Sequence, residues 1–202
     1  MLKKILVNFL FLTFLFNSVS FSQDIPVIVI APSKKPQSVS TVGTSVVVLD
    51  EEFLKNTNEY FLGDVLSGNT TSVNFFQNGG HGSTSAIQLR GLPKRYSTVY
   101  IDGVKMSDPS SVSGDFDFNH ILTSQISRVE ILKGNQSSVY GSGAIGGTIN
   151  ITTKKGQPGR QKNYMFNTGS YGTNNYSANY SGADENKDFY IGFERFQTSG
   201  MS

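Results

Sequence analysis

The chain has 202 residues, of which 37% are hydrophobic and 16% charged, and it contains 21 Gly, 15 Phe, 9 Tyr, no Trp and no Cys. About one or two domains fit this length, which excludes a large multidomain enzyme. Because Gly is enriched and charge is low, the composition favours aromatic β structure with glycine turns and excludes coiled coil and collagen. Without Cys, disulfides, thiolate metal sites and thiol nucleophiles are excluded as well.

The first residues predict a secretory signal peptide. Lys3 and Lys4 precede an apolar stretch over residues 5–16, which is shorter than the roughly 20 apolar residues of a membrane-spanning helix. Ser20-Phe21-Ser22 supplies a cleavage site, so we expect residues 1–22 to be removed and the protein to leave the cytoplasm; an N-terminal anchoring helix is the alternative. Without those lysines the acidic and basic residues balance, and a neutral chain predicts no nucleic-acid partner.

A short β-branched run opens the mature chain at residues 24–31, and residues 32–38 follow it with Pro, Ser and Lys. This pattern predicts an extended strand on a flexible tether. An exposed strand of this kind offers its backbone to a partner by strand addition. Pro26 has no N–H to donate, so its position must face away from the partner strand.

Residues 24–158 alternate between strand and helix patterns, which predicts a compact α+β unit. Strands are expected at 44–49, 73–76, 86–90, 126–133 and 147–153, and helices after Asp50 and from Thr57 or Asn58 to 68–69. Asp102-Gly103 lies between two apolar runs and predicts a hairpin with positive φ at both central residues. The alternation over 126–133 predicts a strand with one buried face.

The pattern changes after residue 159. Alternating aromatic and polar residues fill the segments 162–171, 174–182 and 188–196, and each has about the length of a tilted membrane-spanning strand, which is about 9 to 11 residues. We expect the start of an antiparallel transmembrane β-barrel that is truncated here, because three strands cannot close a barrel and an open edge is unstable in lipid. The alternative is an exposed soluble pair of hairpins.

No motif predicts catalysis, a metal site or a cofactor. Residues 141–146 match the dinucleotide pattern G-x-G-x-x-G, but a β-branched strand follows where that fold needs a helix. Tight turns and close packing of strands explain these glycines better. His81 and His120 lack a third zinc ligand, and Asp115 and Asp117 lack the remaining ligands of a calcium loop. We therefore expect a protein that is not an enzyme.

Residues 129–153, which run from Val-Glu-Ile-Leu-Lys-Gly through Gly-Ser-Gly-Ala-Ile-Gly-Gly to Ile-Thr-Thr, resemble the plug signature of TonB-dependent outer-membrane receptors. Residues 87–91 and 99–104 resemble two further plug motifs in the expected order. The resemblance covers roughly residues 24–158, with Asn135 where the family usually has Pro. Within the family, Asn78-Gly79-Gly80 and residues 112–114 make the chain most similar to the cobalamin receptors.

The resemblance implies a plug domain inside a barrel of about 22 strands in the outer membrane of a Gram-negative bacterium. It also implies a receptor and transporter for a scarce large nutrient, energised by TonB and its inner-membrane complex. The implied division is a signal peptide at 1–22, the TonB box and linker at 23–38, the plug at 39–158 and the first barrel strands at 159–202. A cobalamin-like ligand is expected, and an iron chelate (a siderophore) or a secreted soluble plug-like module are the alternatives.

Two polar loops and the N-terminal run hold the expected binding residues. Short polar side chains and backbone amides suit a large hydrogen-bonding ligand of little charge better than a strongly anionic iron chelate, which would prefer Arg-rich loops; this favours cobalamin weakly. The expected ligand contacts are Asn78, Gly79, Gly80, His81, Ser83, Ser85, Met106, Ser107, Asp108, Ser111, Val112, Ser113 and Asp115. The expected TonB contacts are Asp24, Ile25, Pro26, Val27, Ile28, Val29, Ile30 and Ala31.

Overall fold

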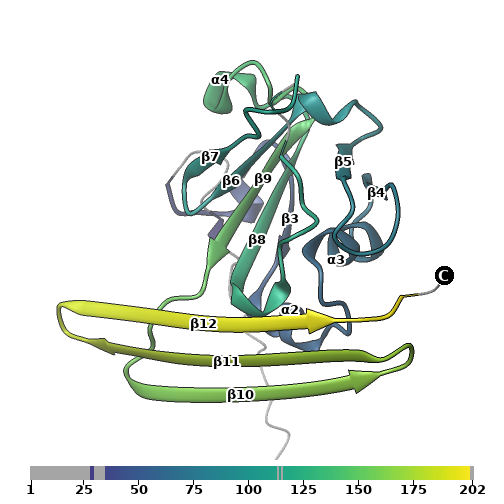
Figure 1. Ribbon diagram of the computed structural model, residues 1–202. Coiled ribbons are helices and arrows are strands. Elements are labelled where there is room, and N and C mark those ends of the chain that lie inside the picture. Colours follow the sequence, from purple (N-terminus) through teal and green to yellow (C-terminus); the bar gives the residue numbers. More distant parts are fainter. Residues whose placement is uncertain (1–27, 30–34, 113, 115, 201–202) are drawn as a thin grey trace, which may run out of the picture.

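The computed structural model describes residues 28–29, 35–112, 114 and 116–200. Its chain forms two parts: an α+β domain and, after residue 158, a three-stranded sheet that we call the C-terminal sheet. Figure 1 shows the long strands of this sheet lying across one end of the α+β domain, beside helix α2. No helix of the described residues is long and apolar enough to cross a membrane.

A five-stranded mixed sheet forms the centre of the α+β domain, in the order β3-β8-β9-β6-β7. Neighbouring strands are antiparallel except β6 and β9, which are parallel. The strands are β3 (Ser45–Leu49), β6 (Ser97–Ile101), β7 (Val104–Met106), β8 (Ile126–Lys133) and β9 (Gly147–Thr153). The predicted strands over 44–49, 126–133 and 147–153 are thus confirmed within a residue at each end.

Strand β8 is buried on both faces, so the prediction of a single buried face is wrong. Val129 and Ile131 pack in the main core, while Leu132 packs with Tyr140 and Ala144 in a smaller cluster on the other side. The alternation in the sequence predicts one buried and one exposed face. The main core covers one face of β8, and the segment around α4 (Ser137–Tyr140) covers the other, so both faces exclude water.

Two helices cover the main core. Helix α2 (Glu51–Asn56) begins as predicted, because the Asp50 carboxylate accepts a hydrogen bond from the Phe53 amide at 2.9 Å. Helix α3 (Leu62–Asn69) ends where expected but has Phe61 at its N-cap, with no side-chain cap. The predicted caps are therefore wrong: Thr57 instead ends α2, and its hydroxyl accepts from the Glu59 amide.

Two hairpins complete the domain. Strands β4 (Val73–Gln77) and β5 (Ser85–Leu89) pair in antiparallel register beside α3. The predicted turn between β6 and β7 is confirmed, with φ of 48° at Asp102 and 82° at Gly103. The Asp102 carboxylate also accepts from the amide and hydroxyl of Thr153, so this turn is fixed to the end of β9. Three short 3-10 helices connect the elements: η1 (Val39–Thr41), η2 (Lys94–Tyr96) and η3 (Thr123–Gln125).

The C-terminal sheet consists of β10 (Gly159–Gly169), β11 (Thr173–Asp184) and β12 (Lys187–Gln197), all antiparallel. One face carries large exposed apolar side chains, among them Tyr164, Ile191 and Phe193, which are 78%, 66% and 63% exposed. The face turned to the α+β domain is polar, with Asn175 and Ser181 buried there. The alternation predicted from the sequence is therefore a division between an apolar outer face and a polar inner face.

The N-terminal run is described only at β1 (Ile28–Val29), which pairs with β2 (Gln37–Ser38). Val29 is fully buried, which corrects the prediction of an exposed strand at this residue: its backbone is paired and its side chain is out of water. The other residues of 24–31 and the expected signal peptide lie outside the described residues.

Candidate functional site

The loop between β4 and β5 holds the first group of expected ligand residues. Asn78, Gly79, Gly80 and His81 are exposed there, and Ser83 is partly buried. Backbone hydrogen bonds shape the loop, from the Asn78 amide to Thr84 O at 3.1 Å and from the Ser83 amide to Gly80 O at 3.1 Å. These hydrogen bonds fix the conformation of the loop, which exposes short polar side chains and backbone groups to solvent.

Ser85 differs from the other expected contacts, because it is only 3% exposed. Its hydroxyl donates to the Asp117 carboxylate and accepts from the Phe118 amide. The prediction that Ser85 faces a ligand does not fit this placement, since both its hydrogen-bonding roles are used inside the fold. The alternation that buries Ile87 and Leu89 in β5 also buries Ser85, and this signal was available in the sequence.

The second group of expected residues lies after β7. Met106 is partly buried against the core and Val112 is fully exposed. The Asp108 carboxylate accepts from the amide and hydroxyl of Ser110, and the Ser111 amide donates to Asp108 O, which makes a local turn; Ser107 is exposed. Ser113 and Asp115 lie outside the described residues.

Two residues that the sequence did not single out for binding connect this segment to the first loop. Asp117 accepts from the amide of Ser85, and the Asn119 side chain donates to Gly82 O and Ser83 O at 3.3 and 2.9 Å. Asn119 also donates to Asp117 Oδ2 at 3.2 Å. Asp117 and Asn119 thus hold the loop 78–85 and the segment after 112 together, a role set by tertiary packing rather than by any local motif.

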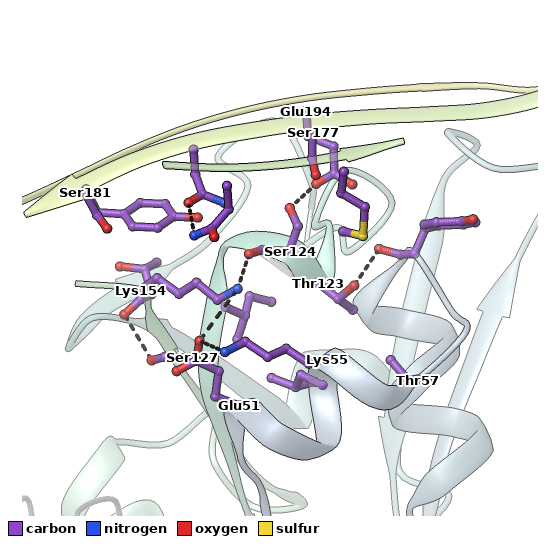
Figure 2. Close-up of a pocket in the computed structure, with 18 of the residues that line it drawn as sticks. Glu51, Lys55, Thr57, Thr123, Ser124, Ser127, Lys154, Ser177, Ser181 and Glu194 are labelled. Atoms are coloured by element: carbon purple, nitrogen blue, oxygen red, sulfur yellow. Dashed lines mark hydrogen bonds and ion pairs between the residues drawn. The ribbon is translucent and has the colours of Figure 1, made fainter. Parts of the chain in front are cut away.

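A polar network joins the α+β domain to the C-terminal sheet (Figure 2). Glu194 of β12 accepts from the Ser124 hydroxyl, and its second oxygen accepts from Asn175 Nδ2 at 2.9 Å. Lys154 donates to Ser124 O at 2.6 Å and lies 3.9 Å from Glu51. Burial lowers the pKa of Lys154, with Glu51 acting in the opposite direction.

A cavity of about 870 Å³ lies between the two parts, beside this network. Amide and hydroxyl groups dominate its wall from the sheet side, including Asn163, Asn179 and Ser177, and α2 contributes Glu51 and Lys55. A polar wall of this kind lets water fill the gap and leaves the two parts joined by few direct bonds. Beside this cavity, the direct contact between the two parts is therefore concentrated at Glu194.

Replacing Glu194 with Ala should weaken this contact. Two hydrogen bonds to a carboxylate are lost, and Asn175, which is 1% exposed, is left without its partner, for an expected loss of about 1–3 kcal/mol. Amide hydrogen exchange of residues 123–127 in the full-length protein would measure this loss. Glu185→Ala, in the exposed turn between β11 and β12, is the matched control, and equal exchange in both variants would contradict the expected role.

An aromatic cluster makes a second contact between the two parts. The ring of His81 stacks on Phe61 with centroids 4.4 Å apart and an interplanar angle of 8°, and Phe196 of β12 lies edge-on to both rings. His81 Nδ1 is 3.8 Å from Asp64 Oδ2. Burial raises the pKa of Asp64, while His81 opposes that shift.

One charged pair lies within strand β8 of the central sheet. Arg128 donates to Glu130 at 2.8 Å, two residues along β8, and Glu130 is 4% exposed. Among the described residues, no three His, Cys, Asp or Glu side chains gather as metal ligands would. The strand β9 follows the glycines of 141–146, as the sequence predicted against a nucleotide-binding helix.

Comparisons with known proteins agree with this architecture. Residues 38–148 match the family model described as the TonB-dependent receptor plug domain. The fold is similar to the ferric yersiniabactin uptake receptor from Yersinia pestis, with a TM-score of 0.61 and 23% identity over 80% of this chain and 25% of that one. It is also similar to the ferric-catecholate import receptor from E. coli K12, with a TM-score of 0.62 and 24% identity over 82% of this chain and 22% of that one.

A third likeness is to the siderophore receptor PirA from Acinetobacter baumannii, with a TM-score of 0.57 and 22% identity over 76% of this chain and 24% of that one. At these identities the likeness concerns the fold. The chain spans about a quarter of the length of these solved structures.

Proposed function

We propose that this chain, which belongs to the TonB-dependent receptor plug domain family, is the movable plug of a transporter that takes up a scarce large nutrient. The family places it in the outer membrane of a Gram-negative bacterium. The predicted fold class, an α+β plug followed by antiparallel strands of a receptor barrel, is confirmed. The family is one of transport receptors, and the function we propose is transport rather than catalysis.

One observation carries the proposal: the C-terminal sheet turns a polar face to the plug and an apolar aromatic face outward. That division suits a barrel wall with lipid outside and a plug inside. The plug meets the wall through Glu194 and the ring cluster, with a polar cavity between. Few direct bonds have to break when the plug moves, so motion is the step that the geometry favours.

We assign the parts of the chain accordingly. Residues 1–22 are the signal peptide, 23–38 the TonB box and linker, 39–158 the plug and 159–202 the first barrel strands. TonB binds residues 24–31 by strand addition, in which backbone hydrogen bonds give affinity. Because β1 pairs with β2 on one edge, TonB either adds to the other edge of β1 or takes the place of β2.

An iron chelate is the better-supported cargo. The similar structures named above are receptors for ferric yersiniabactin, ferric catecholates and other siderophores. Cobalamin is the second candidate, favoured by the uncharged loop of Asn78, Gly79 and Gly80, which suits a neutral hydrogen-bonding ligand. In both cases we place the cargo against the exposed residues of the loops 78–83 and 107–112.

Binding to the intact receptor in detergent tests the cargo. Saturable binding of a ferric catecholate, with none of cyanocobalamin, is the expected result, and the reverse would select cobalamin. Membrane fractionation tests the architecture in the same preparation. Recovery of the protein in the soluble periplasm would contradict the receptor and favour the soluble plug-like module.

A further inference from the structure

The C-terminal sheet divides its charged side chains between its two faces. Residues directly opposite each other in an antiparallel pair share a face, so the register assigns four basic residues to the apolar outer face: Arg160, Lys162, Lys187 and Arg195. Asp188 and Glu194 of β12 lie on the inner face, where Glu194 meets Ser124. A charge on a lipid-facing surface is costly away from the headgroups, so the outer basic residues need water or an anion as a partner.

Arg160 and Lys162, which we call the basic pair, lie close together near the start of β10. Both are exposed, and neither forms an ion pair with any residue that the structure describes. Residues two apart in a strand lie on the same face, about 7 Å from each other. The guanidinium and the ammonium can therefore both reach one phosphate group.

Aromatic rings form the surface beside the basic pair. Lys162 Nζ lies 5.7 Å from the centroid of the Tyr180 ring, which is directly across from it in the register. The Tyr180 ring packs on Phe189 with centroids 5.1 Å apart, and Phe189 covers Gly182, where an added Cβ would lie 2.9 Å from Phe189 Cε1. The basic pair thus borders an apolar surface on which the glycerol part of a lipid can lie.

The other two basic residues of the outer face are less suited to bind an anion. Lys187 lies opposite the carboxylate of Asp184 in the register. Arg195 lies near the end of β12, and its Nη2 donates to Gln197 Oε1 at 3.5 Å. Lys187 therefore has an acidic neighbour, and Arg195 has no second cation beside it in the register.

The position of the basic pair along the sheet indicates which side of the membrane it meets. The loop 78–85 contacts the end of β12, where the His81 ring lies 5.7 Å from Phe196. The start of β10 lies at the opposite end of the sheet, beside the start of β12 (Figure 1). In the proposed function, on which this inference rests, the loop faces the extracellular cargo. The basic pair then lies at the periplasmic end of the wall, level with the lipid headgroups of that leaflet.

We propose that Arg160 and Lys162 bind the phosphate of an anionic glycerophospholipid, such as phosphatidylglycerol, in the periplasmic leaflet. The planar guanidinium of Arg160 takes two phosphate oxygens, and the ammonium of Lys162 adds a point charge. The acyl chains lie on the apolar residues toward the middle of the sheet, among them Ile191 and Phe193. A zwitterionic headgroup binds more weakly, because it brings its own ammonium beside two cations.

Native mass spectrometry of the full-length receptor in detergent tests this site, with phosphatidylglycerol and phosphatidylethanolamine as probes. We expect phosphatidylglycerol to bind at least about fivefold more tightly. Arg160→Gln combined with Lys162→Gln should lower its affinity about tenfold. Arg195→Gln removes a charge from the same face at the other end of the sheet, and it should change this affinity by less than about twofold. A phosphatidylglycerol with a photoreactive headgroup should label peptides within residues 159–164.

Several results would overturn the lipid site. These are equal binding of the two lipids, unchanged phosphatidylglycerol affinity in the double variant, an equal loss in Arg195→Gln, or labelling confined to other peptides. If the circular dichroism of the double variant shows that it does not fold, the lipid preference and the labelling of the unsubstituted receptor decide. Failure of the proposed function looks different, because the protein would then be recovered in the soluble fraction. Failure of the lipid site leaves a membrane-embedded receptor without a lipid preference.

Discussion

Replacing Gly147 with Ala should destabilise the plug by about 3–5 kcal/mol, a large effect for a single methyl group. Gly147 begins β9 with φ of 148°, and a Cβ there would lie 2.2 Å from the Leu132 carbonyl oxygen and 2.8 Å from Leu89 Cδ1. Neither a buried strand carbonyl nor a packed core leucine can move aside cheaply. Amide hydrogen exchange of β8 and β9 in the intact receptor would measure the loss.

Gly43→Ala is the matched control for this substitution. Gly43 has ordinary backbone and no atom within 4 Å of an added Cβ, so its replacement should leave the exchange within about 0.5 kcal/mol or stabilise the plug slightly. Similar protection from exchange in the two variants would contradict the close contact between β9 and β8 at Gly147.

Removing the carboxylate of Asp117 should have the second largest effect, about 2–4 kcal/mol, concentrated in the two loops. In Asp117→Ala, Ser85 loses the acceptor for its amide and hydroxyl while staying buried, and Asn119 loses the partner at 3.2 Å. The loop 78–85 is then no longer held to the segment after 112. We expect faster amide exchange of residues 79–84 and cargo affinity reduced by at least about tenfold.

Asp117→Asn removes the negative charge of the side chain and keeps its shape. The amide oxygen still accepts hydrogen bonds, so the Asn variant should lose less than half of what the Ala variant loses. Equal protection of residues 79–84 in Asp117→Ala and the unsubstituted protein would contradict the bracing role of Asp117.

Local signals in the sequence were enough for most elements of the fold. Asp102-Gly103 requires positive φ at two successive residues, which specifies a tight hairpin. The Asp50 cap and the acidic first turn likewise specify the start of α2. In both places a few neighbouring residues determine the backbone, so no knowledge of the rest of the fold is needed.

Predictions failed where tertiary contacts decide. Both faces of β8 are buried because segments distant in the sequence cover them. The local sequence pattern of a strand does not indicate whether one or both of its faces will be covered. Helix α3 starts at Leu62 without a side-chain cap because its N-terminus is held instead by the backbone bond from the Leu62 amide to Ile121 O. That bond joins segments about sixty residues apart.

Some residues of the candidate site could likewise be predicted from the local sequence, and others could not. The exposed polar loop of Asn78, Gly79 and Gly80 could be found from composition, since turn residues cluster there. The roles of Asn119, Glu194 and Phe196 could not, because each depends on which remote group it meets: Gly82, Ser124 and His81 respectively.

Uptake by a receptor that lacks residues 24–31 tests the central claim most directly. In intact cells, we expect the deleted receptor to reach the outer membrane and bind cargo at the surface with unchanged affinity. It should fail to accumulate cargo inside and fail to be retained by purified TonB. Uptake and TonB retention equal to those of the full-length receptor would contradict the account, because the plug would then move without being pulled at its N-terminal strand.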